Sequence, residues 1–382
     1  MRLFPGVALA WVAVMPASGQ ERCASTPPPA GGQTTMLQSV ESASPPSTLT
    51  VPVVVHILWR TPAEDIADDQ VRSQIESLNA DFARGNADFV RVPAVFAARA
   101  ANTGIRFVLA TTDPHGRPTT GIVRKRTSAQ LWINDDRIKR AHTGGSDPWD
   151  THAYLNIWVG NLSPSLLGVA TFPGTPADRD GIVIRHNAFG TRGAVAAPWN
   201  KGRTLTHEVG HWLGLRHLWG DTPCGDDGID DTPRQKAANR GTPSFPLLRS
   251  ECPNGPDGDM FMNFMDLSDD AALLMFTRGQ AALMRTQLTT ARKDILSSKG
   301  AGEPWNLTPV PSTARVRLHP NPAHDHIRIE GIGPDTPVEL YNTHGQLLLR
   351  QRMGEGRLDL PHLPAGIYRL RVGGELQPLV MQ

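Results

Sequence analysis

Apolar side chains recur along the chain with helical and strand periods, which predict where the elements lie. Residues 51–58 form a β-branched apolar run typical of a buried strand. The next segment, 68–84, has one apolar face at helical spacing, formed by Val71, Ile75, Leu78 and Phe82. Further strands are predicted at 105–109, 154–159 and 181–184. Because strands and helices are intermixed, we expect an α+β domain.

A second helix is predicted after a capping box formed by Thr277 and Gln280. Its apolar side is expected to consist of Leu283, Met284, Leu288, Ala291 and Ile295. We therefore place the end of the first domain at residue 297 and its start at residue 49. Residues 298–314 contain Gly, Ser and Pro and are predicted to be a linker. Residues 315–382 show only strand periods and predict a small β-sandwich.

The first 19 residues differ from the rest of the chain. A lone Arg2 precedes an apolar run over 3–16, followed by small residues at 17–19. This pattern predicts a cleaved signal peptide over 1–19. The alternative is a membrane anchor, but the run is shorter than the roughly 20 apolar residues of a spanning helix. Residues 20–48, rich in Pro, Gly, Ser and Thr, look like a disordered leader.

Composition and charge exclude some classes of function. The chain has 382 residues, 39% of them hydrophobic, and a net charge of +1, so no basic surface points to nucleic acid or an anionic membrane. Of the three cysteines, Cys224 and Cys252 bracket a loop dense in Asp, Gly and Pro. If they pair, the disulfide would stabilise the fold by about 3 kcal/mol and leave Cys23 unpaired.

The segment 206–221, THEVGHWLGLRHLWGD, contains the densest chemistry in the chain. His207 and His211 are four residues apart and therefore share one helix face. Glu208 lies between them in an H-E-x-x-H arrangement, where two imidazoles bind zinc and the carboxylate acts as general base. Gly214 permits a sharp turn that would return His217 as a third ligand. The alternative, histidines without a metal, is a poor match to this spacing.

The extended pattern H-E-x-x-H-x-x-G-x-x-H resembles the metzincin zinc peptidases, which carry a methionine turn beneath the metal. Met265, within MNFMDLSDD, makes the chain similar to the pappalysin family of this class. Further likeness is found at 53–58, 74–82, 154–158, 168–174 and 218–221. The resemblance implies a twisted mixed sheet with a backing helix and an active-site helix. It also implies a secreted zinc endopeptidase that acts on proteins or peptides.

The resemblance also implies roles for further residues. The substrate would lie antiparallel to the strand that contains Gly168, Val169, Ala170 and Thr171. Asp269 and Asp270 would form the floor of the pocket after the scissile bond, which favours Arg or Lys there. One departure is Leu267, because relatives have a tyrosine at this position. It keeps open the alternative of an idle zinc-binding adhesion protein, although the intact Glu208 argues against it.

Two regulatory features are implied in the same way. The acidic turn 226–233 would by composition be a solvated turn, but its likeness to a family loop favours Ca²⁺ bound by Asp227, Asp230 and Thr232. Cys23 would bind the zinc as a fourth ligand and keep a propeptide, residues 20–48, inhibitory until it is removed. The alternative for Cys23 is an incidental or intermolecular thiol.

The C-terminal part resembles the sorting domain of type IX secretion. The likeness rests on HPNPA at 319–323, on 338–345 and on 358–368. It implies export through the periplasm and recognition by the type IX machinery. The product would be released or attached to the cell surface. The alternative is a module that binds carbohydrate or matrix.

Overall fold

The computed structural model describes residues 21–27, 47–248, 251–252, 255–301, 316–341, 347–372 and 375–382. The chain divides into two compact units, one ending at Gly302 and the other beginning at Glu303. The predicted signal peptide, most of the propeptide and most of the linker lie outside the described residues. Residues 299–301 form a short 3₁₀ helix with a buried Gly300, so the first residues of the predicted linker belong to the first unit.

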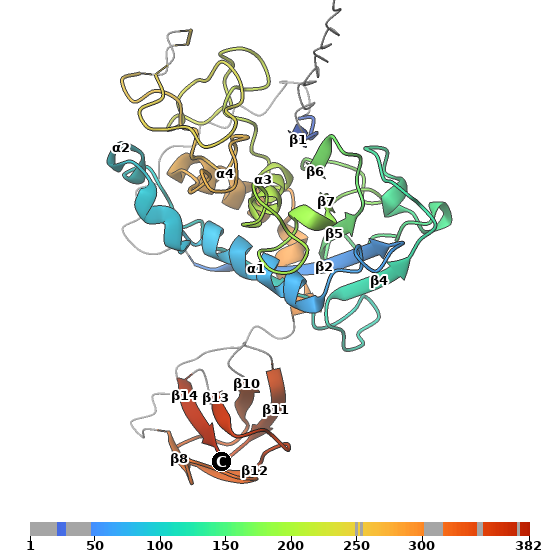
Figure 1. The fold of residues 1–382 in the computed structure, drawn as a ribbon, viewed down its shortest axis with the longest axis vertical. Coiled ribbons are helices and arrows are strands. Elements are labelled where there is room, and N and C mark those ends of the chain that lie inside the picture. Colours follow the sequence, from blue (N-terminus) through green and yellow to red (C-terminus); the bar gives the residue numbers. More distant parts are fainter. Residues whose placement is uncertain are drawn as a thin grey trace, which may run out of the picture. The chain divides into compact units, whose positions relative to one another are not determined.

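A mixed sheet forms the centre of the first unit (Figure 1). The described strands follow the order β1-β6-β7-β5-β2-β3, and β4 pairs with the second half of β2. β6 is antiparallel to β7, whereas the other pairs are parallel. The bounds are β1 Glu21–Cys23, β2 Leu49–Trp59, β3 Ile105–Leu109, β4 Ile122–Arg126, β5 Leu155–Gly160, β6 Leu166–Ala170 and β7 Ile182–Arg185.

The longer helices of the first unit are α1, α3 and α4. α1, Asp68–Phe82, packs on β3 and on α3, Arg203–Trp212, while α3 also packs on β6 and β7. α4, Arg278–Thr289, begins with the predicted capping box but ends at Thr289, so the predicted helix was too long. Short elements are η1 Ala87–Arg91, α2 Ala94–Ala97, η2 Arg137–Lys139, η3 Ala141–Thr143, η4 His186–Ala188, η5 Lys293–Ser297 and η6 Lys299–Ala301.

The core of the first unit runs from the sheet to the segment below α3. Phe82 packs edge-on against Phe107 and Phe276, and Phe276 packs in the same way against Phe264. One apolar cluster therefore links α1, the sheet and the segment that contains Met265. This arrangement confirms the predicted α+β class. Among the described residues, no helix has both the length and the apolarity needed to span a membrane.

The second unit consists of two antiparallel sheets that share an apolar core. Residues Ile327, Ile329, Val338, Leu340 and Leu370 in this core are fully buried. One sheet has the order β11-β10-β13-β14 and the other β12-β9-β8. The bounds are β8 Arg317–His319, β9 His326–Glu330, β10 Thr336–Tyr341, β11 Leu347–Met353, β12 Gly356–Asp359, β13 Gly366–Val372 and β14 Glu375–Met381.

Candidate active site

Three imidazoles converge at the C-terminal half of α3. His207 and His211 lie one turn apart, with their Nε2 atoms 3.0 Å from each other. Gly214 has a φ of +91°, which turns the chain back after the helix. The turn brings the Nε2 atom of His217 to 3.1 Å from that of His211. Cys23 completes a group of four possible ligands whose ligand atoms all lie within 4.8 Å of one another.

The opposite nitrogen of each imidazole faces a hydrogen-bond acceptor. The contacts join Nδ1 of His207 to the Phe264 carbonyl at 2.7 Å, Nδ1 of His211 to the Leu215 carbonyl at 2.8 Å, and Nδ1 of His217 to the Asp221 carboxylate at 2.6 Å. A carbonyl only accepts, so Nδ1 of His207 and of His211 carries the proton and Nε2 presents its lone pair. Burial, then the neighbouring histidines, lowers the pKa of His207 and of His211 well below the usual value. Neutral imidazoles beside a thiol are a donor set that suits zinc.

Glu208 lies beside this group and is fully buried. The strand β6 passes so close that a β-carbon at Gly168 would lie 2.8 Å from Cγ of Glu208. Its Oε2 atom accepts a hydrogen bond from the Ser25 hydroxyl at 2.8 Å. Its Oε1 atom has no hydrogen-bond partner among the described residues. Burial raises the pKa of Glu208 to about 7 in this form, in which Ser25 and Cys23 cover the carboxyl.

The strand β1 covers the group and was not predicted from the sequence. It pairs with β6 in parallel, with Cys23 opposite Gly168. Ser25 accepts a hydrogen bond from the Ala170 amide at 2.8 Å while donating to Glu208. Burial and the nearby Glu208 raise the pKa of the Cys23 thiol well above its usual range. A strand of three residues has almost no period, and its partners lie more than a hundred residues away, so the sequence carried little sign of it.

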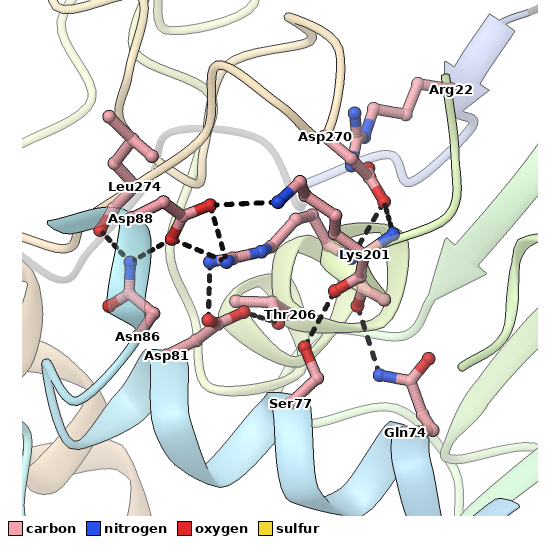
Figure 2. Close-up of polar contacts among 12 residues, drawn as sticks. Arg22, Gln74, Ser77, Asp81, Asn86, Asp88, Lys201, Thr206, Asp270 and Leu274 are labelled. Carbon is pink, nitrogen blue, oxygen red and sulfur yellow. Dashed lines mark hydrogen bonds and ion pairs between the residues drawn. The ribbon is translucent and has the colours of Figure 1, made fainter. Parts of the chain in front are cut away.

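Arg22 lies buried next to the imidazoles. Its guanidinium is fully buried, donates to Oδ1 of Asp270 at 2.5 Å and lies 4.9 Å from the centre of the Trp199 ring. Asp270 is also buried, and its Oδ2 atom accepts from the amides of Lys201 and Arg203 (Figure 2). Asp269 is partly exposed, and its amide donates to the Gly241 carbonyl. Of the two predicted carboxylates, only Asp270 contacts Arg22.

Met265, the residue predicted for the methionine turn, lies against Gly210 of α3. A β-carbon at Gly210 would be only 2.4 Å from the Met265 sulfur, so the glycine makes room for this side chain. The following Asp266 is buried and accepts from Asn239 at 2.7 Å and from Gln235 at 3.0 Å. Leu267 is 5% exposed and offers no polar group to a substrate.

The loop after His217 holds the remaining predicted residues. The structure joins Cys224 and Cys252 in a disulfide. Asp227 is buried, and its carboxylate accepts from the Thr232 hydroxyl at 2.9 and 3.0 Å, whereas Asp230 is exposed. Burial raises the pKa of Asp227 to about 7.

Asp231, in the same loop, was given no role in the sequence analysis. It accepts from the Thr277 hydroxyl and the Gly279 amide and so fixes the loop to the start of α4. In the sequence, the capping box at Thr277 was the only sign that polar groups gather at the start of α4.

Two family models match the chain. Residues 139–289 match the peptidase family described as pregnancy-associated plasma protein-A. This range contains the three histidines, Glu208 and Met265. Residues 317–380 match the secretion system C-terminal sorting domain. The second match lies within the second compact unit.

The chain is also similar to individual proteins of known sequence and structure. An extracellular metalloprotease of Trichophyton verrucosum is 31% identical over 276 residues, which cover 68% of this chain and 88% of the relative. Mature mirolysin of Tannerella forsythia, solved with a cleaved peptide, is 46% identical with a TM-score of 0.64 and covers 66% of this chain and 97% of that one. A promirolysin mutant matches equally well and covers 85% of that chain. The chain therefore belongs to the pregnancy-associated plasma protein-A family and is a secreted metalloendopeptidase with a type IX sorting domain.

Proposed function

We propose that the enzyme is a zinc peptidase that uses His207, His211 and His217 as ligands and Glu208 as its general base. The observation that carries the proposal is the convergence of three Nε2 atoms beside a buried carboxylate and the strand β6. Bound zinc supplies Lewis-acid chemistry that polarises the peptide carbonyl and lowers the pKa of water. Glu208 takes a proton from the attacking water and gives it to the departing amine.

Casein hydrolysis tests the roles proposed for the three histidines and for Glu208. Elemental analysis of the purified enzyme is expected to give one zinc per chain. Casein hydrolysis is expected to stop on addition of a zinc chelator and in the variant Glu208→Ala. Casein hydrolysis by Glu208→Ala at the wild-type rate would contradict the proposed role of Glu208.

The substrate is proposed to pair with β6 along Gly168, Val169, Ala170 and Thr171 in the antiparallel direction. Removal of β1 would open this edge of β6, because β1 is its neighbour on that side. An exposed edge strand offers a row of amides and carbonyls to an extended peptide. β1 itself runs parallel to β6, so it occupies the same groove in the opposite direction.

We infer a preference for Arg or Lys after the scissile bond, with Asp270 as the selecting residue. Support comes from Arg22, whose buried guanidinium contacts the Asp270 carboxylate. Asp269 does not share this role, since it is partly exposed and apart from Arg22. A peptide library digested by the active enzyme is expected to show cleavage before Arg and Lys. Cleavage mainly before hydrophobic residues would contradict this preference.

The segment around Cys23 is proposed to keep the precursor inactive by occupying three groups at once. Cys23 lies within the histidine group, Ser25 contacts Glu208, and Arg22 fills the pocket. The variant Cys23→Ala should therefore give a precursor that cleaves casein without processing, with Thr26→Ala as an exposed neighbouring control. If Cys23→Ala stays as inactive as the wild-type precursor, the thiol is incidental.

A calcium ion is proposed at the loop of Asp227, Thr232 and the Asp230 carbonyl. A buried carboxylate with a raised pKa is a group that a cation would stabilise. Calcium is expected to raise the melting temperature of the zinc-loaded enzyme, and the variant Asp227→Asn is expected to abolish this rise. An equal rise in Asp227→Asn and wild type would place the effect elsewhere.

A further inference from the structure

We propose that Asp81 of α1 is a positioning residue that sets the preference for a cationic side chain without touching the substrate. It acts through the segment 201–203, which holds the pocket carboxylate Asp270. This inference rests on the selecting role proposed above for Asp270.

The first step is a buried ion cluster below the pocket. Asp81 is fully buried, and Arg203 is 4% exposed. The Arg203 guanidinium donates to Asp81 and, at 3.0 Å, to Asp88. Asp81 also accepts from the Thr206 hydroxyl at 2.6 Å. Burial raises the pKa of Asp81 to about 7 while the charge of Arg203 acts in the opposite direction, so the carboxylate depends on this partner.

The second step is the segment 201–203, which α1 holds from the other side. The Ser77 hydroxyl donates to the Lys201 carbonyl at 2.7 Å, and the Gln74 amide donates to the Gly202 carbonyl at 3.1 Å. Figure 2 shows these bonds converging on the segment from α1. The carbonyls and the Arg203 side chain are thus anchored on α1, and the backbone amides are left to face Asp270.

The third step is the orientation of Asp270. Its Oδ2 atom accepts from the Lys201 amide at 2.7 Å and from the Arg203 amide at 3.3 Å. Its Oδ1 atom is thereby directed toward the pocket, where it contacts Arg22. A carboxylate held in one orientation favours a cationic side chain more strongly than a carboxylate that can rotate. If the carboxylate moves by about 1 Å, much of the binding energy that depends on its fixed position is lost.

Two fluorogenic peptides that differ only in the residue after the scissile bond, Arg or Leu, test the proposal. The readout is the ratio of their kcat/KM values. In Asp81→Asn we expect this ratio to fall about tenfold toward unity. Ser77→Ala, which removes one bond to the Lys201 carbonyl, should lower it by about threefold. The matched control is Glu76→Gln, an exposed position on the same helix, for which the ratio should equal that of the wild type.

A purely structural role for Asp81 would lower both kcat/KM values equally and leave the ratio unchanged, and that result in Asp81→Asn and Ser77→Ala would overturn the proposal. The ratio does not depend on the fraction of active enzyme, so partial misfolding of a variant does not mimic the effect. A ratio near one in the wild type would instead contradict the selecting role of Asp270. The wild type is measured first, so this failure is distinguished from a failure of the Asp81 proposal.

The sequence of the propeptide carries a second inference, which rests on the proposed preference for Arg or Lys but not on Asp81. Between Arg22 and Arg60 the chain contains no lysine or arginine. A cut before Arg22 would leave Cys23 attached to the catalytic unit, and Arg22 lies in a strand whose direction is opposite to that proposed for a substrate. We infer that the enzyme does not release its own propeptide. An endopeptidase that cleaves at non-basic residues must supply the active form, provided that the proposed preference for Arg or Lys holds.

This inference can be tested with the inactive precursor Glu208→Ala as the substrate. Wild-type enzyme is first activated by subtilisin, and the subtilisin is then blocked with a serine-protease inhibitor. The activated enzyme is incubated with the precursor. Mass spectrometry should find residues 23–48 intact. The same precursor with Gln38→Arg should be cut before position 38, whereas Gln38→Ala should stay intact. Cleavage within 23–48 of the natural sequence at the rate seen for Gln38→Arg would overturn the inference. A library digest without basic preference would show that the specificity proposal has failed instead.

Discussion

The two compact units bury different kinds of side chain. The C-terminal unit has an apolar core, and among its described residues Glu339 is the only buried charged one, paired with Arg350 at 2.7 Å. The first unit buries many charged and polar groups around α3, among them Asp81, Arg203 and Glu208. Burying such groups destabilises a fold unless each finds a partner. The comparison shows that the unit that contains the histidine group buries more charged and polar side chains than the C-terminal unit does.

The largest expected effect is on the buried carboxylate beside the imidazoles. Glu208→Gln should lower kcat/KM on a peptide substrate by about a thousandfold, because the amide cannot take a proton from water. The zinc content of the variant, measured by elemental analysis, should stay at the wild-type value. Activity within a few-fold of the wild type would mean that Glu208 is not the base.

A substitution in the apolar core of the second unit should affect stability and leave catalysis intact. Leu340 is fully buried, so Leu340→Ala should destabilise this unit by about 3 kcal/mol. Calorimetry of the full chain should show that the unfolding transition of the second unit moves to a lower temperature than in the wild type. The kcat/KM of the processed enzyme should be unchanged, and the amount of exported protein should fall. An equal loss of catalytic activity would show that the two units are energetically coupled.

A buried histidine in the first unit should make its stability depend on pH. Burial lowers the pKa of His56 from 6.5 to about 4, and its ring nitrogens contact Ser146 and Asn156 at 3.0 Å. Below pH 6.5 His56 binds a proton in the unfolded chain but stays neutral in the folded chain. The free energy of unfolding therefore falls as the pH falls from 6.5 to about 4.

The variant His56→Gln isolates this contribution. Denaturant unfolding at several pH values should give a shallower pH dependence for the variant, with a difference approaching about 3 kcal/mol across that range. Parallel curves for the two proteins would show that His56 does not titrate differently in the folded state.

The smallest effect is expected at the start of α4. Thr277 caps the helix, so Thr277→Ala should lower the free energy of unfolding of the first unit by about 1 kcal/mol. Thr286→Ala, in the interior of the same helix, serves as the control and should be neutral or slightly stabilising. Equal losses in both variants would argue against a specific contribution of the cap.

Much of the fold was predictable because its patterns are local. The strand at 51–58, the helix from 68 and the capping box at Thr277 all follow from short-range periodicity or spacing. The end of α4 was misplaced by the same reasoning. Ile295 continues the apolar spacing of α4 but belongs to a separate 3₁₀ helix. Because it is buried and has the spacing expected of α4, it was wrongly assigned to that helix.

Amino-acid spacing alone predicted the histidine group that we propose binds zinc. Two histidines four residues apart on a helix must share a face, and a glycine at 214 allows the chain to return a third. Only the tertiary structure decided that β1 joins β6, that Asp270 rather than Asp269 meets Arg22, and that Asp81 reaches Arg203. These partners are more than a hundred residues apart, and local patterning contains no information on which distant surfaces meet when the core closes.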